Sequence, residues 1–341
     1  MKLLVTGGAG FIASNYIRHV LLTHPDYHII NLDSLTYAGN LENLKDIEGS
    51  ERYTFLKGDI CDKNIADGLE FDAILNFAAE SHVDRSILDA RPFLQTNIMG
   101  TYNLLEIARQ RDCTFVHIST DEVYGSIEDG FFNEESPLMP NSPYAASKAS
   151  SDMLVRAYVE THKINAMITR CSNNYGPYQF PEKLIPLVIL NAIKGKPIPV
   201  YGDGMNVRDW IYVGDHCNAV DAVLHKGIPG NVYNIGCRNE QPNIDLIKKI
   251  LSKIAERLDR DENKLMDLIN FVEDRKGHDR RYAIDPLMIE KDLGWKPEMT
   301  FDEGIEETIK WYTSNDQWWD RIISGEYVKY YNLQYGERFE K

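Results

Sequence analysis

No apolar segment of this 341-residue sequence is long enough to cross a bilayer, since the longest, residues 184–193, contains Pro186 and Asn191. A secretory signal is also missing, because the first apolar residues soon meet two glycines at positions 7 and 8. Five scattered cysteines form no Cys-x-x-Cys pair, which favours reduced, buried thiols over disulfides. We therefore expect a soluble, cytoplasmic protein with no membrane contact.

Basic charge is also scarce, since the net charge of −15 argues against a broad nucleic-acid-binding surface. The nine histidines show no His-x-x-x-His or His-Glu-x-x-His spacing, so no metal site is expected. One basic cluster stands out: Arg275, Lys276, His278, Arg280 and Arg281. This cluster is either a solvated surface paired with neighbouring aspartates or a clamp for a small anion such as a diphosphate.

Apolar runs alternate with helical patterns along the first half of the chain. The alternation predicts an α/β fold with a Rossmann-like, doubly wound parallel sheet. After residue 171, proline and glycine become more frequent, which indicates a second, smaller region. We expect an NAD-binding domain over residues 1–172, to which later segments can return, and a mainly substrate-binding C-terminal α/β region over residues 173–341. The expected strands are residues 2–6, 27–32, 53–56, 73–77, 114–119 and 166–171, and the expected helices include residues 13–22, 93–109 and 143–162.

A glycine-rich loop follows the first expected strand, with the spacing Gly7-xx-Gly10-xx-Ala13. Small residues let the backbone approach a pyrophosphate, which the start of the following helix attracts. Asp33, at the end of the second strand, can bind ribose hydroxyls and repels a 2′-phosphate. The pattern predicts a dinucleotide site that prefers NAD to NADP, with Asp59 and Ile60 on the adenine side.

A Tyr-x-x-x-Lys pair, Tyr144 and Lys148, stands at the start of an expected helix, where residues four apart share a face. A nearby ammonium lowers the pKa of a phenol from its usual ~10, which would make Tyr144 a usable base. A second copy, Tyr53 and Lys57, lies on an expected strand, where residues four apart are too distant to cooperate.

Thr120, Asp121 and Glu122 follow the strand expected at residues 114–119. The carboxyl end of a strand is where open α/β sheets place their chemistry. Because consecutive strand residues point to opposite faces, both acids can face one ligand only if the chain turns here. An isolated pair of this kind would more often be an acidic loop or a helix N-cap.

Together these residues resemble the extended short-chain dehydrogenase/reductases, and within them the dTDP-glucose 4,6-dehydratase family. The general signatures are residues 6–12, the Tyr144–Lys148 pair and residues 208–213. The more specific ones are residues 33–40, 78–86, 120–125, 171–178, 182–186 and 277–282. The sequence departs from the family at Ala13, in place of the third glycine, and at Lys276, where proline is usual.

The resemblance implies a three-step internal redox cycle on a nucleotide sugar. Tyr144, as phenolate, would take the 4-hydroxyl proton while hydride leaves C4 for NAD, with Thr120 hydrogen-bonding nearby. Glu122 would remove the C5 proton and Asp121 would protonate the departing C6 hydroxyl, after which hydride returns to C6. The two acids need opposite protonation states, so their environments must separate their pKa values.

The resemblance also implies the binding residues, a homodimer and a role in dTDP-rhamnose biosynthesis. The dimer helices would be residues 93–109 and 143–162, whose apolar faces could equally cover their own sheet. Aromatic residues near the C-terminus (Trp318, Trp319, Tyr330 and Tyr331) are expected in the core or an interface. The expected NAD contacts are Gly7, Gly10, Phe11, Ile12, Asp33, Ser34, Leu35, Thr36, Asp59, Ile60, Phe77, Ala78, Ala79, Ser81, Thr96, Tyr144, Lys148 and Asn174. The expected nucleotide-sugar contacts are Ser81, Thr120, Asn173, Lys183, Leu184, Pro199, Tyr201, Arg208, Asn243, Arg275 and His278.

Two alternatives remain at this stage. A nucleotide-sugar 4-epimerase or a UDP-sugar dehydratase could use the same scaffold, although an epimerase has no use for the acid pair. A non-catalytic NAD-sensing protein would be expected to lose Tyr144, Lys148 or the acids, and all of them are present.

Overall fold

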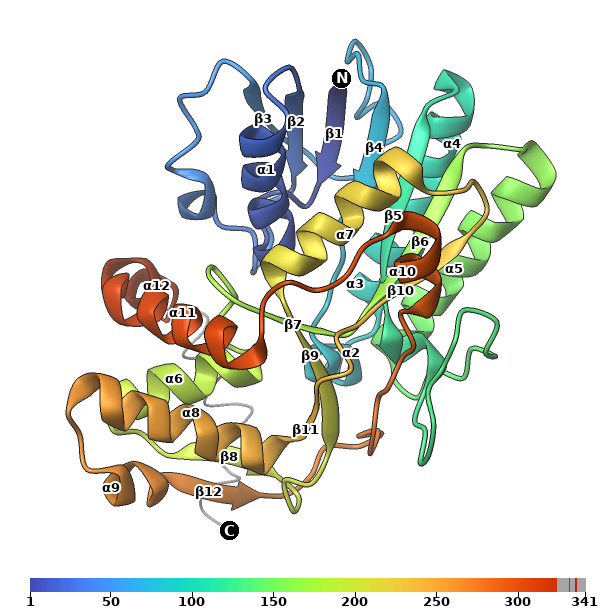
Figure 1. Cartoon of the computed structure of the whole chain (residues 1–341). Coiled ribbons are helices and arrows are strands. Elements are labelled where there is room, and N and C mark those ends of the chain that lie inside the picture. The colour runs from blue at the N-terminus through green and yellow to red at the C-terminus, as the bar shows by residue number, and fades with distance from the viewer. Residues whose placement is uncertain (324–330, 332–334, 336–341) are drawn as a thin grey trace.

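The computed structural model of this chain describes residues 1–323, 331 and 335 and contains a seven-stranded parallel sheet (Figure 1). The strand order is β10-β6-β5-β4-β1-β2-β3, and each neighbouring pair is parallel. The predicted Rossmann-like, doubly wound sheet is therefore confirmed. The strands are β1 (Lys2–Thr6), β2 (His28–Asp33), β3 (Tyr53–Lys57), β4 (Ala73–Asn76), β5 (Thr114–Thr120), β6 (Ala166–Cys171) and β10 (Val232–Ile235).

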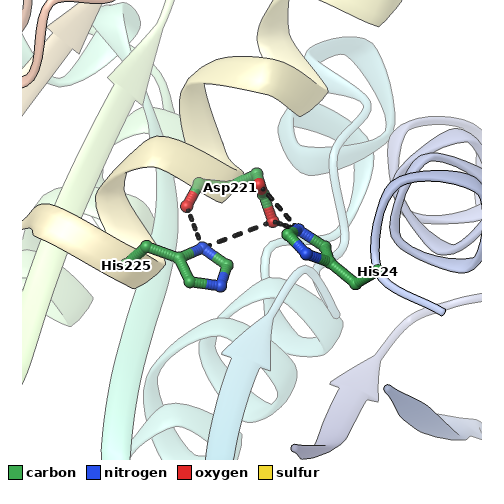
Figure 2. A group of neighbouring side chains, drawn as sticks. All are labelled: His24, Asp221 and His225. Carbon is green, nitrogen blue, oxygen red and sulfur yellow. Dashed lines mark hydrogen bonds and ion pairs between the residues drawn. The ribbon is translucent and has the colours of Figure 1, made fainter. Parts of the chain in front are cut away.

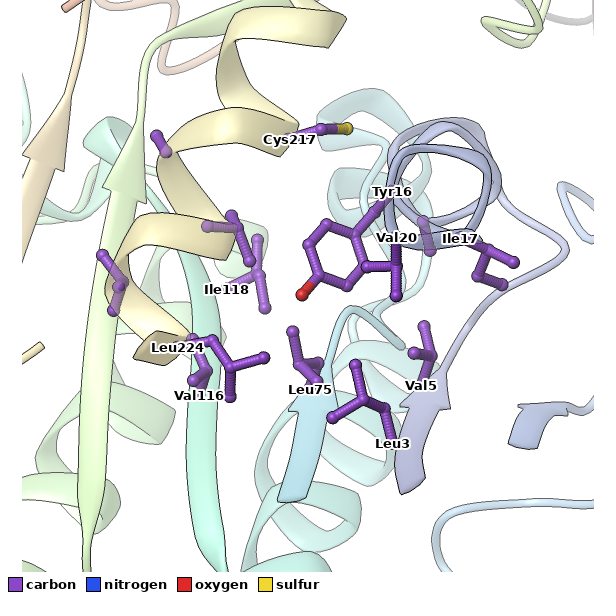
Figure 3. Packing of buried hydrophobic residues seen from close by; sticks show 14 of the residues in the cluster. Leu3, Val5, Tyr16, Ile17, Val20, Leu75, Val116, Ile118, Cys217 and Leu224 are labelled. Atoms are coloured by element: carbon purple, nitrogen blue, oxygen red, sulfur yellow. The ribbon is translucent and has the colours of Figure 1, made fainter. Parts of the chain in front are cut away.

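Helices cover both faces of this sheet. On one face α1 (Phe11–Thr23) and α7 (Val213–Lys226) pack side by side over residues such as Leu3 and Val116 (Figure 3). On the other face α4 (Thr101–Arg111) and α5 (Pro143–His162) bury a second apolar layer. The central strands are therefore buried on both sides, which explains their continuous apolar sequences.

The second region has its own core, built on two small sheets. One sheet contains β7 (Asn173–Tyr175), β9 (Val207–Tyr212) and β11 (Glu240–Pro242), and the other contains β8 (Ile198–Tyr201) and β12 (Ile269–Val272). Helices α6 (Leu184–Lys194), α8 (Asn243–Leu258), α11 (Phe301–Ser314) and α12 (Asp316–Ile322) pack around them. In Figure 1 the arrowheads of the large sheet point toward this region. The carboxyl edge of the sheet thus faces the second region.

The shorter elements complete the chain. They are η1 (Leu41–Leu44), α2 (Val83–Leu88), α3 (Arg91–Phe93), η2 (Leu94–Gly100), η3 (Asp121–Tyr124), α9 (Glu262–Met266) and α10 (Leu287–Leu293). The single helix expected at residues 93–109 is instead α3, the π-helical η2 and α4 in succession. The helix expected at residues 143–162 is found as α5, begun by Pro143 and by Ser142, whose hydroxyl accepts from the Ala145 N–H.

Other expectations concern single side chains. All five cysteines are free, and Cys113, Cys171 and Cys217 are buried. Trp318 and Trp319 are buried in the second core, whereas Tyr330 lies outside the described residues. Among the described residues, no helix has the length and apolar character needed to span a membrane.

Candidate active site

The glycine loop between β1 and α1 brings the backbone against a cavity of about 340 Å³. Gly7 has a φ of +69°, and a Cβ added there would lie 2.7 Å from the Ala78 Cα. Gly10 is the N-cap of α1 and makes no side-chain capping hydrogen bond. The close approach of the chain and the uncapped helix start suit an anionic pyrophosphate.

Asp33 ends β2 beside this loop and ties two backbone segments together. Its Oδ2 accepts from the Ala9 N–H at 2.9 Å, and its Oδ1 accepts from the Leu35 N–H at 2.7 Å. Burial raises the pKa of Asp33, and these two hydrogen bonds act against that rise. Each carboxylate oxygen keeps a further lone pair, so the group can still accept from ribose hydroxyls.

Nearly all the predicted cofactor contacts line this first cavity. The exception is Leu35, whose φ is +56° and whose side chain packs against the core of the sheet. The predicted contacts that line it are Gly7, Gly10, Phe11, Ile12, Asp33, Ser34, Thr36, Asp59, Ile60, Phe77, Ala78, Ala79, Ser81, Thr96, Tyr144, Lys148 and Asn174, together with the predicted catalytic residues Thr120, Asp121 and Glu122.

The acid pair lies where β5 ends and the 3₁₀ helix η3 begins. The Thr120 hydroxyl caps this turn by accepting from the Glu122 N–H at 3.3 Å, and it donates to Asp121 Oδ1 at 3.3 Å. The turn required for both acids to face one ligand is therefore present. Asp121 is 2% exposed, and its Oδ2 has no hydrogen-bond partner among the described residues.

The surroundings of the two carboxyl groups differ. Burial, followed by the negative charge of Glu122, raises the pKa of Asp121 well above its usual value. Burial also raises the pKa of Glu122, but the charges of Arg275, Lys183 and Arg208 oppose that rise. Asp121 is thereby favoured as the protonated acid, and Glu122 as the more easily ionised partner.

Tyr144 and Lys148 project from the first turns of α5 into the same cavity. The expectation that the ammonium lowers the phenol pKa is wrong for the chain alone. Burial, followed by the charge of Glu122, raises the pKa of Tyr144 well above its usual value. Lys148 Nζ donates to the Ile118 carbonyl at 2.7 Å, and burial lowers its own pKa to about 8. Desolvation thus outweighs the attraction that the spacing suggested.

A buried ion pair lies one helical turn beyond Lys148. Asp152 accepts from Arg170 Nε at 2.8 Å, and both side chains are almost fully buried. Arg170 also donates to the Tyr124 hydroxyl at 2.7 Å. This network fixes α5 against β6 directly behind the lysine.

A second cavity of about 170 Å³ adjoins the first, and Glu122, Asn173 and Lys183 line both. The remaining predicted sugar-nucleotide contacts line the second cavity: Leu184, Pro199, Tyr201, Arg208, Asn243, Arg275 and His278. Ser81 and Thr120 line the first. Contacts that are far apart in the sequence are therefore brought together in two neighbouring cavities.

Several buried polar atoms around the second cavity have no hydrogen-bond partner among the described residues. They are Arg275 Nε, Asn173 Oδ1, Gln179 Oε1, Asn243 Oδ1 and Trp210 Nε1. Buried polar groups are nearly always hydrogen-bonded in folded proteins. A cluster of unsatisfied donors and acceptors around a cavity therefore fits a polar ligand, and the guanidinium fits an anionic one.

The basic cluster noted in the sequence divides between two roles. Arg275 and His278 line the second cavity, whereas Arg280 pairs with Asp203 and Arg281 with Glu240. Of the neighbouring aspartates, Asp274 pairs with His278 at 2.6 Å, and the binding of an anion by the cluster stays a prediction. Arg208 donates to the Asp279 carbonyl at 2.8 Å and stacks over Tyr282, which orients its guanidinium at the cavity wall.

Sequence reasoning did not single out several other residues that line the cavities. Among them are Tyr37, Gln179, Glu182, His82 and Tyr282. Glu182 and Tyr282 stand inside motifs already noted for the resemblance. Tyr37 and His82 also stand inside such motifs, at residues 33–40 and 78–86, whereas Gln179 follows the motif at residues 171–178 and carries no signal of its own.

A Rossmann-like sheet, a glycine loop and a Tyr-x-x-x-Lys pair facing one cavity define an extended short-chain dehydrogenase/reductase. Residues 4–308 match the family model described as GDP-mannose 4,6 dehydratase. A dTDP-glucose 4,6-dehydratase from Escherichia coli is 52% identical over 96% of this chain and 98% of its own length. The chain therefore belongs to the dTDP-glucose 4,6-dehydratase family.

Solved structures agree with this assignment. The dTDP-glucose 4,6-dehydratase DesIV from Streptomyces venezuelae, with NAD and TYD bound, is 48% identical, with a TM-score of 0.89 over 94% of this chain and 100% of that one. A UDP-glucuronic acid 4-epimerase from Bacillus cereus, in complex with UDP-glucuronic acid and NAD, is 28% identical, with a TM-score of 0.83 over 92% of this chain and 99% of that one. The epimerase shares the fold at much lower identity.

Proposed function

We propose that this protein converts dTDP-glucose into dTDP-4-keto-6-deoxyglucose and water, with NAD as its cofactor. The observation that carries the proposal is the pair Asp121 and Glu122. Two adjacent acids with separated pKa values face the cavity that the glycine loop also lines. Elimination of water needs this combination of an acid and a base.

The first cavity fits the cofactor. Gly7 leaves room where a side chain would collide with Ala78, α1 starts uncapped, and the Asp33 carboxylate lies at the end of β2. NAD bound in this cavity would supply a positively charged nicotinamide ring as the acceptor of hydride from sugar C4, and its reduced form would supply the hydride for C6. The chain's residues bind and orient the reactants and move the protons.

Tyr144 is the group proposed to remove the proton of the sugar 4-hydroxyl. Its pKa is raised in the chain alone, so additional positive charge in the cavity is needed to favour the phenolate. The buried ammonium of Lys148 is proposed to supply part of that charge. Hydrogen bonding with Thr120 also favours ionisation of the phenol.

Glu122 is proposed to remove the C5 proton, which the C4 ketone makes acidic. Asp121 then donates its proton to the C6 hydroxyl as water leaves. Arg275, Lys183 and Arg208 favour the ionised form of Glu122, whereas the negative charges of Glu122 and Asp209 oppose ionisation of the buried Asp121. These surroundings support the proposed roles of acid and base.

The second cavity is proposed to hold the nucleotide part of the substrate. Arg275 and Arg208 would bind the diphosphate, and Asn173 and Asn243 offer unsatisfied amide oxygens. Under this proposal residues 1–172 mainly bind the cofactor and residues 173–341 mainly bind the substrate, with β10 returning to the large sheet. A cytoplasmic location belongs to the same proposal.

The direct test is to incubate the purified protein with dTDP-glucose without added reductant and to measure the mass of the sugar nucleotide. Loss of one water supports the proposal. An unchanged mass with NAD confirmed present would refute this pairing of substrate and reaction. UDP-glucose and UDP-glucuronic acid, assayed for water loss and for epimerisation at C4, test the alternative activities of the same scaffold.

We also propose a homodimer that buries one face of α2, η2, α4 and α5. Large apolar side chains are exposed on these elements: Ile87, Leu88, Leu94, Met99, Tyr102 and Met153. An apolar patch of this kind is typical of an interaction surface. Light scattering should give the mass of a dimer, and Met153→Glu should give a monomer. Met139→Glu, an exposed methionine outside these elements, is the matched control.

A further inference from the structure

A cluster of histidines surrounds one aspartate where the C-terminal end of α1 meets that of α7. His24 follows α1, and Asp221 and His225 lie one turn apart on α7 (Figure 2). His19, on the last turns of α1, borders the same carboxylate. None of these four residues lines either cavity of the active site. The proposed reaction therefore leaves the cluster without a role.

The ligating atoms are close together. His24 Nε2 lies 3.0 Å from Asp221 Oδ2, and His225 Nδ1 lies 3.6 Å from Asp221 Oδ1. One atom from each of the three residues lies within 4.8 Å of the others. Four nitrogen or oxygen ligands at about 2.0–2.1 Å from a tetrahedral Zn²⁺ lie roughly 3.3 Å from one another. The observed separations need only small side-chain shifts to reach that arrangement.

His19 provides a candidate for the fourth ligand. Its Nε2 is buried, lies 3.8 Å from Asp221 Oδ2, and makes no hydrogen bond within the described part of the chain. A buried imidazole nitrogen without a partner is unusual in a folded protein. The position of His19 beside the Asp221 carboxylate would let both side chains bind the same cation.

The cluster is also held in place before any ion binds. The His24 ring stacks on Tyr27 at 4.4 Å and on His225 at 4.9 Å between centroids. His225 Nδ1 lies 2.7 Å from the Asp221 carbonyl, and its Nε2 lies 2.8 Å from the Tyr27 hydroxyl. Binding through Nδ1 requires the tautomer in which Nε2–H donates to Tyr27. The second nitrogen thus keeps a partner, as in many metal-binding histidines.

The chemistry of the ligand set also favours a divalent cation. Neutral imidazoles and one carboxylate form a ligand set that suits zinc and related divalent ions.

We propose that His24, Asp221 and His225 form a binding site for a divalent transition-metal ion of the zinc type, and that His19 completes it once its side chain moves toward the ion. The ion would join the end of α1 to the end of α7. Because α1 begins at the glycine loop, the site anchors the far end of the helix that faces the cofactor. No local motif marks these residues in the sequence, because His24 is remote from the Asp-x-x-x-His pair on α7.

The test uses the untagged, NAD-loaded protein after treatment with a chelator and dialysis. Titration with Zn²⁺ should show one saturable site per chain and a rise in melting temperature. His24→Gln and His225→Gln should each weaken binding by at least about tenfold, in the range seen when metal-site residues are altered. His28→Gln, an exposed histidine close by on β2, should bind as the wild type does.

A second measurement does not depend on the variants' folding. Co²⁺ bound to the wild-type protein should give the strong visible absorption of a tetrahedral site, and Zn²⁺ should displace it. Absence of saturable Zn²⁺ binding would overturn the proposal, as would unchanged binding in folded His24→Gln and His225→Gln. A weak octahedral Co²⁺ spectrum would exclude the four-ligand arrangement.

Discussion

Replacing Asp121 by asparagine tests whether this buried carboxyl group donates the proton that water elimination requires. Asparagine keeps the size and polarity of the side chain but cannot transfer a proton. Burial raises the pKa of Asp121 and so favours its protonated form, which asparagine resembles in charge and shape. Folding and cofactor binding should therefore survive, while the elimination step slows.

General acid catalysis contributes roughly 10²- to 10⁴-fold to a rate. At about 1.4 kcal/mol for each factor of ten, this corresponds to about 3–5 kcal/mol of transition-state stabilisation. In the proposed mechanism, oxidation at C4 uses Tyr144 and not Asp121, so that step should keep its rate in the Asp121→Asn variant. We expect reduced cofactor to form at the normal rate and to persist, because elimination has become limiting.

The assay follows a single turnover by the absorbance of the reduced cofactor and by mass spectrometry of the sugar nucleotide. Full wild-type turnover in Asp121→Asn would refute the acid role. Loss of the oxidation step as well would show that Asp121 is needed for binding or geometry and would also contradict the argument. NAD content and circular dichroism serve as controls for folding.

The same variant gives a stability prediction. An aspartate in the unfolded chain ionises near pH ~3.9, whereas the native pKa of Asp121 is well above that value. As pH rises above ~3.9, the unfolded wild type gains stability by ionising while native Asp121 stays protonated, so wild-type stability falls. Asparagine does not titrate. Asp121→Asn should therefore melt no lower than wild type at neutral pH, with the difference vanishing near pH ~4. A lower melting temperature at neutral pH would contradict the burial argument.

Further substitutions test the other parts of the site. Glu122→Gln should retain oxidation at C4 but lose exchange of the C5 hydrogen with deuterated solvent, and normal exchange would reject its role as base. Gly7→Ala should lose bound NAD and lower the free energy of unfolding by about 1–2 kcal/mol or more, because the φ of +69° is unfavourable for alanine and the added Cβ collides with the backbone of Ala78. Unchanged NAD content in this variant would disprove the close approach of the backbone to the cofactor. Asp152→Ala should lower the free energy of unfolding by about 3–5 kcal/mol in urea, since it leaves Arg170 buried and unpaired. As a control, Asp89 forms an exposed ion pair with Arg91, so Asp89→Ala should have no measurable effect on the free energy of unfolding. Equal losses in Asp152→Ala and Asp89→Ala would refute the contribution of burial.

Much of the fold can be predicted from local patterns in the sequence. Alternating apolar runs and helical periods predict the parallel sheet, and the ends of the confirmed strands differ from the expected ones by at most one residue. The glycine loop and the Ser142–Pro143 helix start are also local signals, which explains why both were found. By contrast, nothing in residues 94–100 distinguishes the π-helical η2 from an ordinary helix.

The site is only partly readable from the sequence. The position of Asp121 and Glu122 follows from a strand that ends at Thr120, and the family and cofactor agree with the solved relatives. The roles of the individual site residues stay predictions. The pKa of Tyr144 could not be predicted from its spacing to Lys148, because burial depends on the whole fold. Contacts of the second cavity, such as Arg208, could be predicted only from the resemblance to the family.

The path of the chain between its two cores has a mechanical consequence. The chain leaves the large sheet after β6, re-enters it through α7 and β10, leaves again for β11, and returns once more with α10 before α11. The two halves are thus joined by several separate segments of the chain and not by one linker. Wide hinge opening would have to bend all of these connections together, so it is strongly resisted. A single proteolytic cut at any one of them should leave both halves associated, and the reacting sugar would be enclosed by walls that move little during the cycle.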